Sequence, residues 1–100
     1  MVSLEVVAQT ADRKRLEIRA SIEAPQRQDD GSWVCQVEVV PLQEQRLAVR
    51  GVDSFHAVWL SCALILKLLT HLKSDGGELL NPDGSVFPLE AYLAGLGEQR

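Results

Sequence analysis

The hydrophobic pattern of the chain changes once, near residue 51, and this change constrains the fold more than any other feature. Before it, apolar residues recur at every second position, which is typical of strands that bury one face. After it, apolar residues follow the helical period for about 20 positions. A strand-rich first half and a long helix in the second half indicate a single α+β domain over residues 1–100.

Four stretches of the first half alternate in this way, and we predict a strand in each of them. They cover residues 2–9, 15–23, 33–40 and 46–50. The connections between them are shorter than the crossover of about a dozen residues that parallel neighbours need. Asp30-Gly31 and Pro41 mark turns or strand ends. We therefore expect a four-stranded antiparallel meander with an aliphatic inner face.

The helix is predicted to begin at Asp53-Ser54, two favoured N-cap residues, and to run to about Lys73. Gly76-Gly77 after it suits the left-handed end of a helix. The face expected to lie on the sheet is centred on Val58, Ile65, Leu69 and Leu72. One long helix packed on one face of the sheet is the predicted second layer.

The last part of the chain predicts a hairpin and a short helix. Glu78–Leu80 and residues 85–87 are the arms of the hairpin, joined by the turn Asn81-Pro82-Asp83-Gly84. No glutamate stands at the twelfth position that a calcium loop would need, so the turn is structural. Residues 89–94 form the short helix.

The long helix carries more apolar surface than one sheet can cover. A helix at the surface of a domain needs an apolar stripe of only about 100°. Here apolar residues extend past that stripe, and a leucine lies in the middle of the side that faces away from the sheet. We predict that this side is the interface of a homodimer. The predicted interface residues are Trp59, Leu60, Ala63 and Lys67.

Catalytic, cofactor and metal sites are not expected. Asp53, Ser54 and His56 would suggest a triad, but the first two are cap positions whose oxygens serve backbone N–H groups. Cys35 and Cys62 are predicted to be reduced thiols among core side chains. No spacing of histidine and cysteine in the chain suits zinc.

Charge and hydropathy limit the partners. Ten basic and fourteen acidic residues give a net charge of −4, so we expect no binding to nucleic acid. The longest apolar run, residues 57–66, has ten residues, about half of a membrane span. Residues 1–5 do not read as a signal peptide, and we expect a cytoplasmic protein without membrane contact.

The run Gly51-Val52-Asp53-Ser54-Phe55-His56-Ala57, the apolar helix and Gly76-Gly77-Glu78-Leu79 carry a resemblance. After four strands, this pattern resembles a family of small uncharacterised bacterial proteins, and the similarity covers most of the chain. The resemblance implies a bacterial cytoplasmic origin. It implies no activity, cofactor or catalytic residue.

The predicted function is a non-enzymatic protein-interaction module that self-associates. One alternative is an immunity or antitoxin-like inhibitor of a partner protein, which small size and negative charge also fit. Another is a regulatory subunit that binds a small molecule between the long helix and the C-terminal hairpin. An enzyme is the third alternative.

Overall fold

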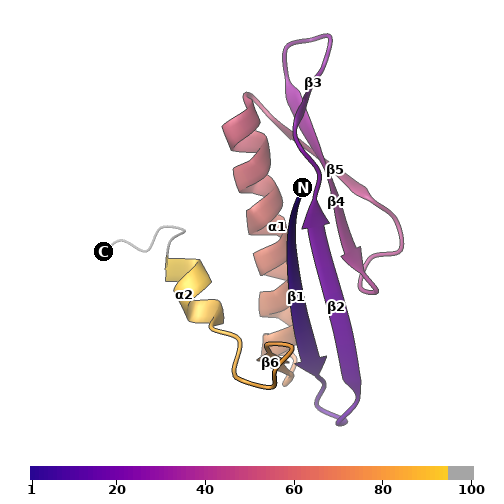
Figure 1. Ribbon diagram of the computed structural model, residues 1–100, viewed down its shortest axis with the longest axis vertical. Coiled ribbons are helices and arrows are strands. Elements are labelled where there is room, and N and C mark those ends of the chain that lie inside the picture. The colour runs from indigo at the N-terminus through magenta and orange to yellow at the C-terminus, as the bar shows by residue number, and fades with distance from the viewer. Residues whose placement is uncertain (95–100) are drawn as a thin grey trace.

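The computed structural model describes residues 1–94 and has two layers, an antiparallel sheet and a long helix that lies along one of its faces (Figure 1). The elements in chain order are β1 (Val2–Gln9), β2 (Arg15–Ile22), β3 (Gln26–Arg27), β4 (Trp33–Val40), β5 (Leu47–Gly51), α1 (Ser54–Ser74), β6 (Glu78–Leu80) and α2 (Leu89–Ala94). The predicted α+β fold, with its meander, long helix and short last helix, is confirmed.

The first four predicted strands form the meander. β1 and β2 pair along their whole length, with Val2 opposite Ile22 and Gln9 opposite Arg15. β4 pairs with β2 on one side and with β5 on the other. β3 was not predicted; it resumes the path of β2 beyond Pro25 and pairs with the same edge of β4.

α1 carries the chain from β5, at one edge of the sheet, to β6 at the other. β6 pairs antiparallel with residues 7–9 of β1, so it extends the sheet. The return arm of the predicted hairpin is only a single bridge between Leu80 and Val86. Within residues 1–94, no strand pairs with the other part of this edge, residues 2–6 of β1.

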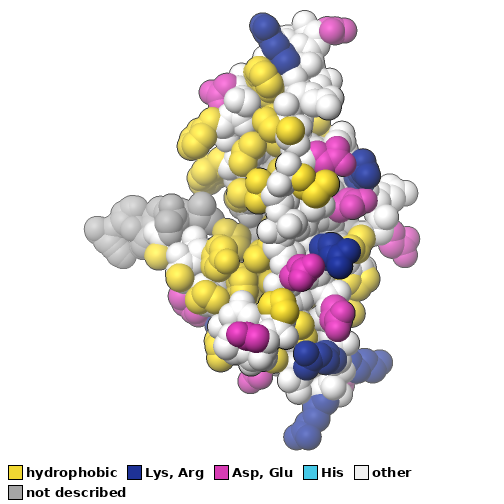
Figure 2. Space-filling view, viewed as in Figure 1, with side chains coloured by type: hydrophobic (Ala, Val, Ile, Leu, Met, Phe, Trp, Pro, Cys, Tyr) yellow, Lys and Arg dark blue, Asp and Glu magenta, His cyan; other side chains and the backbone are white. Residues whose placement is uncertain are grey.

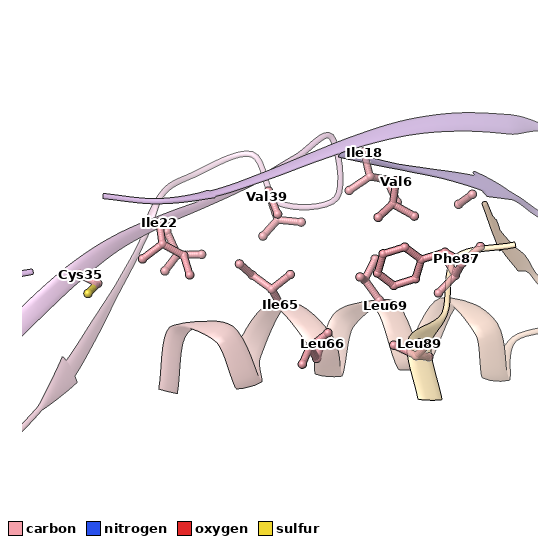
Figure 3. Close-up of a cluster of buried hydrophobic side chains, with 14 of the residues drawn as sticks. Val6, Ile18, Ile22, Cys35, Val39, Ile65, Leu66, Leu69, Phe87 and Leu89 are labelled. Carbon is pink, nitrogen blue, oxygen red and sulfur yellow. The ribbon is translucent and has the colours of Figure 1, made fainter. Parts of the chain in front are cut away.

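The core lies between the inner face of the sheet and α1, and the segment before α2 closes one end of it (Figure 3). Its sheet residues are Val6, Ala8, Ile18, Ala20, Ile22, Cys35, Val37, Val39 and Leu79. Its other residues are Ala57, Ile65, Leu66, Leu69, Phe87 and Leu89.

The face of α1 on the sheet is rotated slightly from the predicted one. Ala57 and Ser61 are fully buried, whereas Val58 and Leu72 are only partly buried. Because Gly51 has no Cβ atom, the end of β5 approaches the backbone of α1 at Ala57. The Ser61 hydroxyl donates a hydrogen bond to the Ala57 carbonyl at 2.8 Å, so its burial leaves no hydroxyl unpaired.

By length and composition alone, α1 is long and apolar enough to cross a membrane, with a mean hydropathy of 1.5 over an 18-residue window. The core helix of a folded domain meets the same criterion. In this fold α1 lies along the sheet, and Ile65 and Leu69 are in the core. Much of its remaining apolar surface also packs on the core, and the exposed large side chains of α1 are Phe55 and Trp59.

Candidate interaction surface

The predicted interface residues lie together on the side of α1 that faces away from the sheet. Trp59 is 43% exposed, Lys67 is exposed, and Leu60 and Ala63 are partly exposed. Neither Trp59 nor Leu60 is among the partly buried hydrophobic side chains that pack against the core.

Phe55 belongs to the same surface, although it was not among the predicted interface residues. It is 78% exposed, and it lies one helical turn before Trp59. Cys62 and Leu66 continue the line, because residues three or four apart share a helix face. We call the line of Phe55, Trp59, Cys62 and Leu66 the α1 flank. The sequence does carry a signal for this flank, because its four members are four, three and four positions apart, which is the spacing of one helix face.

An apolar groove of about 200 Å³ lies between this flank and the sheet. Its lining comes from β1, β2, α1 and α2, and consists of Val2, Ser3, Leu4, Ala20, Ile22, Cys62, Ile65, Leu66 and Tyr92. Figure 2 shows hydrophobic side chains gathered over α1 and β1 on this side of the molecule. The groove is smaller than the roughly 300–1,000 Å³ of typical ligand pockets.

A wider hollow of about 450 Å³ lies on the outer face of the sheet. Its lining includes Glu5 and Arg19, which form an ion pair at 3.5 Å. Elsewhere on the strands, Arg46 contacts both Glu23 and Glu38 at 3.1 Å. In both places a basic side chain is paired with acidic neighbours.

The first turn of α1 uses its polar side chains to satisfy backbone groups. The Asp53 carboxylate accepts a hydrogen bond from the His56 N–H at 2.7 Å, as an N-cap does. The Nδ1 atom of His56 accepts one from the Val52 N–H at 3.1 Å. The predicted N-cap is confirmed, and both side chains hold the junction between β5 and α1.

The turn after β6 is also held by its own side chains. The Asp83 carboxylate accepts hydrogen bonds from the N–H and the hydroxyl of Ser85, at 2.9 and 2.6 Å. These bonds lower the pKa of Asp83, with the hydroxyl as the larger cause. Across residues 1–94, no three His, Cys, Asp or Glu side chains are grouped so that they could hold a metal ion.

Both cysteines are free thiols, but their surroundings differ. Cys35 is fully buried, as predicted, whereas Cys62 is only partly buried because it lines the groove. Burial is the main cause that raises the pKa of the Cys62 thiol, and the neighbouring Cys35 adds to it. A raised pKa lowers the fraction of thiolate, which is the reactive form.

We expect Cys62 to be alkylated more slowly in the native protein than in the unfolded chain. Cys35 is expected to react only as the whole domain unfolds. Mass spectrometry of iodoacetamide-treated protein, with and without urea, measures both rates. The variants Cys62→Ala and Cys35→Ala assign each rate to its thiol. Rapid labelling of Cys35 without urea would contradict the expectation.

Comparisons with known proteins place the chain in one family. No curated protein and no solved structure matches the chain. A family model described as domain of unknown function, DUF6968, matches residues 5–86, which span β1 to β6 from the fourth residue of β1 and include all of α1. The chain therefore belongs to the DUF6968 family, as the resemblance to an uncharacterised family had suggested.

Proposed function

We propose that the protein is a cytoplasmic, non-enzymatic interaction module that forms a homodimer through α1. The observation that carries this proposal is the exposure of two large apolar side chains one turn apart on α1, Phe55 at 78% and Trp59 at 43%. Large apolar patches on the surface of a soluble domain are typical of protein interfaces.

The composition of the surface supports an interface. Tryptophan is enriched among the residues that dominate binding energy, and Trp59 is 43% exposed on α1. Ala63 is small enough to let a second helix approach closely. Full burial of Trp59 or Leu60 would contribute about 1.5–3 kcal/mol for each side chain. Lys67 would remain at the rim, with its aliphatic stem over apolar neighbours.

The polar groups support a non-enzymatic role. Asp53 and His56 are engaged by backbone N–H groups, and Asp83 is engaged by Ser85 within its own turn. A catalytic group instead needs to reach a substrate. The free thiols of Cys35 and Cys62 fit the reducing cytoplasm.

Two other functions make different predictions. An immunity or antitoxin-like inhibitor would use the same surface for a different protein, and the chain alone would be a monomer. A small-molecule-binding regulatory subunit would use the groove beside Cys62 and Tyr92. Its small volume favours the interface over a ligand of metabolite size.

Light scattering at tens of micromolar protein is expected to give a mass twice the 11.0 kDa of the chain. Trp59→Lys should convert the dimer to a monomer at the same concentration, because it places a charge in the interface. Val86→Lys is the matched control: it adds the same charge at a side chain that is 76% exposed, and it should leave the mass unchanged.

A mass of 11.0 kDa for the unmodified chain under these conditions would rule out the homodimer. A dimer that persists in both Trp59→Lys and Leu60→Lys would place the interface away from α1.

A further inference from the structure

The edge of the sheet formed by residues 2–6 of β1 is open. Along one of its edges, β1 pairs with β2 over its whole length. Along its other edge, β6 pairs only with residues 7–9. The N–H and C=O groups along an open edge can pair with a further strand. Natural edges are often protected by lysine, proline or a bulge. Residues 2–6 of β1 contain no lysine, proline or bulge. The charged residue in this stretch, Glu5, forms an ion pair with Arg19.

The open edge lies beside the apolar groove. Leu4 and Val2 line the groove together with Cys62, Leu66 and Tyr92, and Val2 is 60% exposed. A strand added at this edge would therefore gain two things at once. It would pair the free backbone groups, and its own inward side chains would extend the apolar layer next to the groove.

We propose that the added strand is β1 of a second copy, paired antiparallel about a two-fold axis at Leu4. This inference rests on the proposed homodimer and names a second contact within it. Leu4 then faces Leu4, Ser3 faces Glu5, and Val2 faces Val6. Residues opposite each other in a ladder share a face, so the apolar inner faces of the two sheets become continuous.

Charge selects this register among the neighbouring ones. A two-fold axis at Glu5 would place two carboxylates directly opposite each other, which destabilises a strand pair. An axis at Ser3 would pair Glu5 with Met1, which lies outside β1, and would leave only residues 2–4 of the strand in the ladder. The axis at Leu4 gives each Glu5 an uncharged partner that can donate a hydrogen bond, Ser3.

The same register brings the α1 flank into the contact. Because both inner faces lie on the same side of the joined sheet, both α1 helices do as well. α2 lies beside the C-terminal half of α1, where Lys73 Nζ is 2.9 Å from Glu90 Oε2 (Figure 1). The N-terminal half, with Phe55 and Trp59, is left for the second copy.

The test uses Ser3→Lys and Ser3→Glu in the full chain, with the dimer dissociation constant measured by sedimentation. Ser3 is exposed, so both variants should fold. Lysine would face Glu5 of the other copy and tighten the dimer, whereas glutamate would weaken it. Residue 3 of each copy faces Glu5 of the other, so each variant changes two pairs, and the dimer dissociation constant should change by roughly 2- to 30-fold in each direction. Gln9→Lys and Gln9→Glu are matched controls, because β6 covers that position, and they should have no effect.

Alkylation of Cys62 in the unmodified protein gives a second readout. Its rate should fall as the protein concentration rises through the dissociation constant, because the second copy closes the groove. A dimer whose constant is the same in the Ser3→Lys and Ser3→Glu variants would overturn edge pairing and leave the proposed homodimer intact. A monomer at every concentration would overturn both.

Discussion

Gly51→Ala is expected to lower the free energy of unfolding by about 3 kcal/mol, measured by urea denaturation. Gly51 ends β5 where the chain turns toward α1, and it is buried. A Cβ atom there would contact the backbone N of Ala57 and lie 2.8 Å from its Cα. Both contacts are with helix backbone, so no side chain can rotate away to relieve them. The helix would have to move off the sheet.

Gly84→Ala is the control for the loss of glycine itself. Gly84 has a φ of +92°, but a Cβ at this position would meet nothing within 4 Å. Its cost should be limited to backbone strain, about 1–2 kcal/mol. If Gly51→Ala costs no more than Gly84→Ala, the close approach of α1 to β5 does not limit stability.

The sequence predicted the parts of the fold that depend on local patterns. Period-two alternation located four strands, and Asp53 with Gly76-Gly77 located the ends of α1. The exact face of α1 was not predictable in this way, because Ala57 and Ser61 contribute little to a hydrophobic pattern. The burial of Ala57 follows from the close approach of α1 to Gly51 at the end of β5, which only the assembled sheet defines.

The candidate site was also predicted in part. Surplus apolar residues on α1 pointed to Trp59 and Leu60, and the structure leaves both outside the core. The open edge of β1 could not be found from the sequence, because it depends on how far β6 pairs along β1. That pairing joins residues about 70 positions apart, and hydrophobic periodicity does not report the partner of a strand.

Phe87→Ala is expected to lower the free energy of unfolding by about 3–5 kcal/mol, the largest effect of a single side chain that we predict. The Phe87 ring is fully buried and lies between Val6 on the sheet and Leu69 on α1 (Figure 3). The ring of Tyr92 in α2 stacks on it, with centroids 4.9 Å apart. The mutation therefore removes a core side chain and the support of α2.

Val86→Ala is the matched control, because the neighbouring side chain is exposed and its loss should cost less than about 0.5 kcal/mol. Since Tyr92 lines the groove, loss of its stacking partner should also speed alkylation of Cys62 below the urea transition. That second effect separates a local release of α2 from a uniform loss of stability, in which Cys62 and Cys35 would become reactive together. A cost below about 1 kcal/mol for Phe87→Ala would mean that the segment after β6 is not part of the cooperative core.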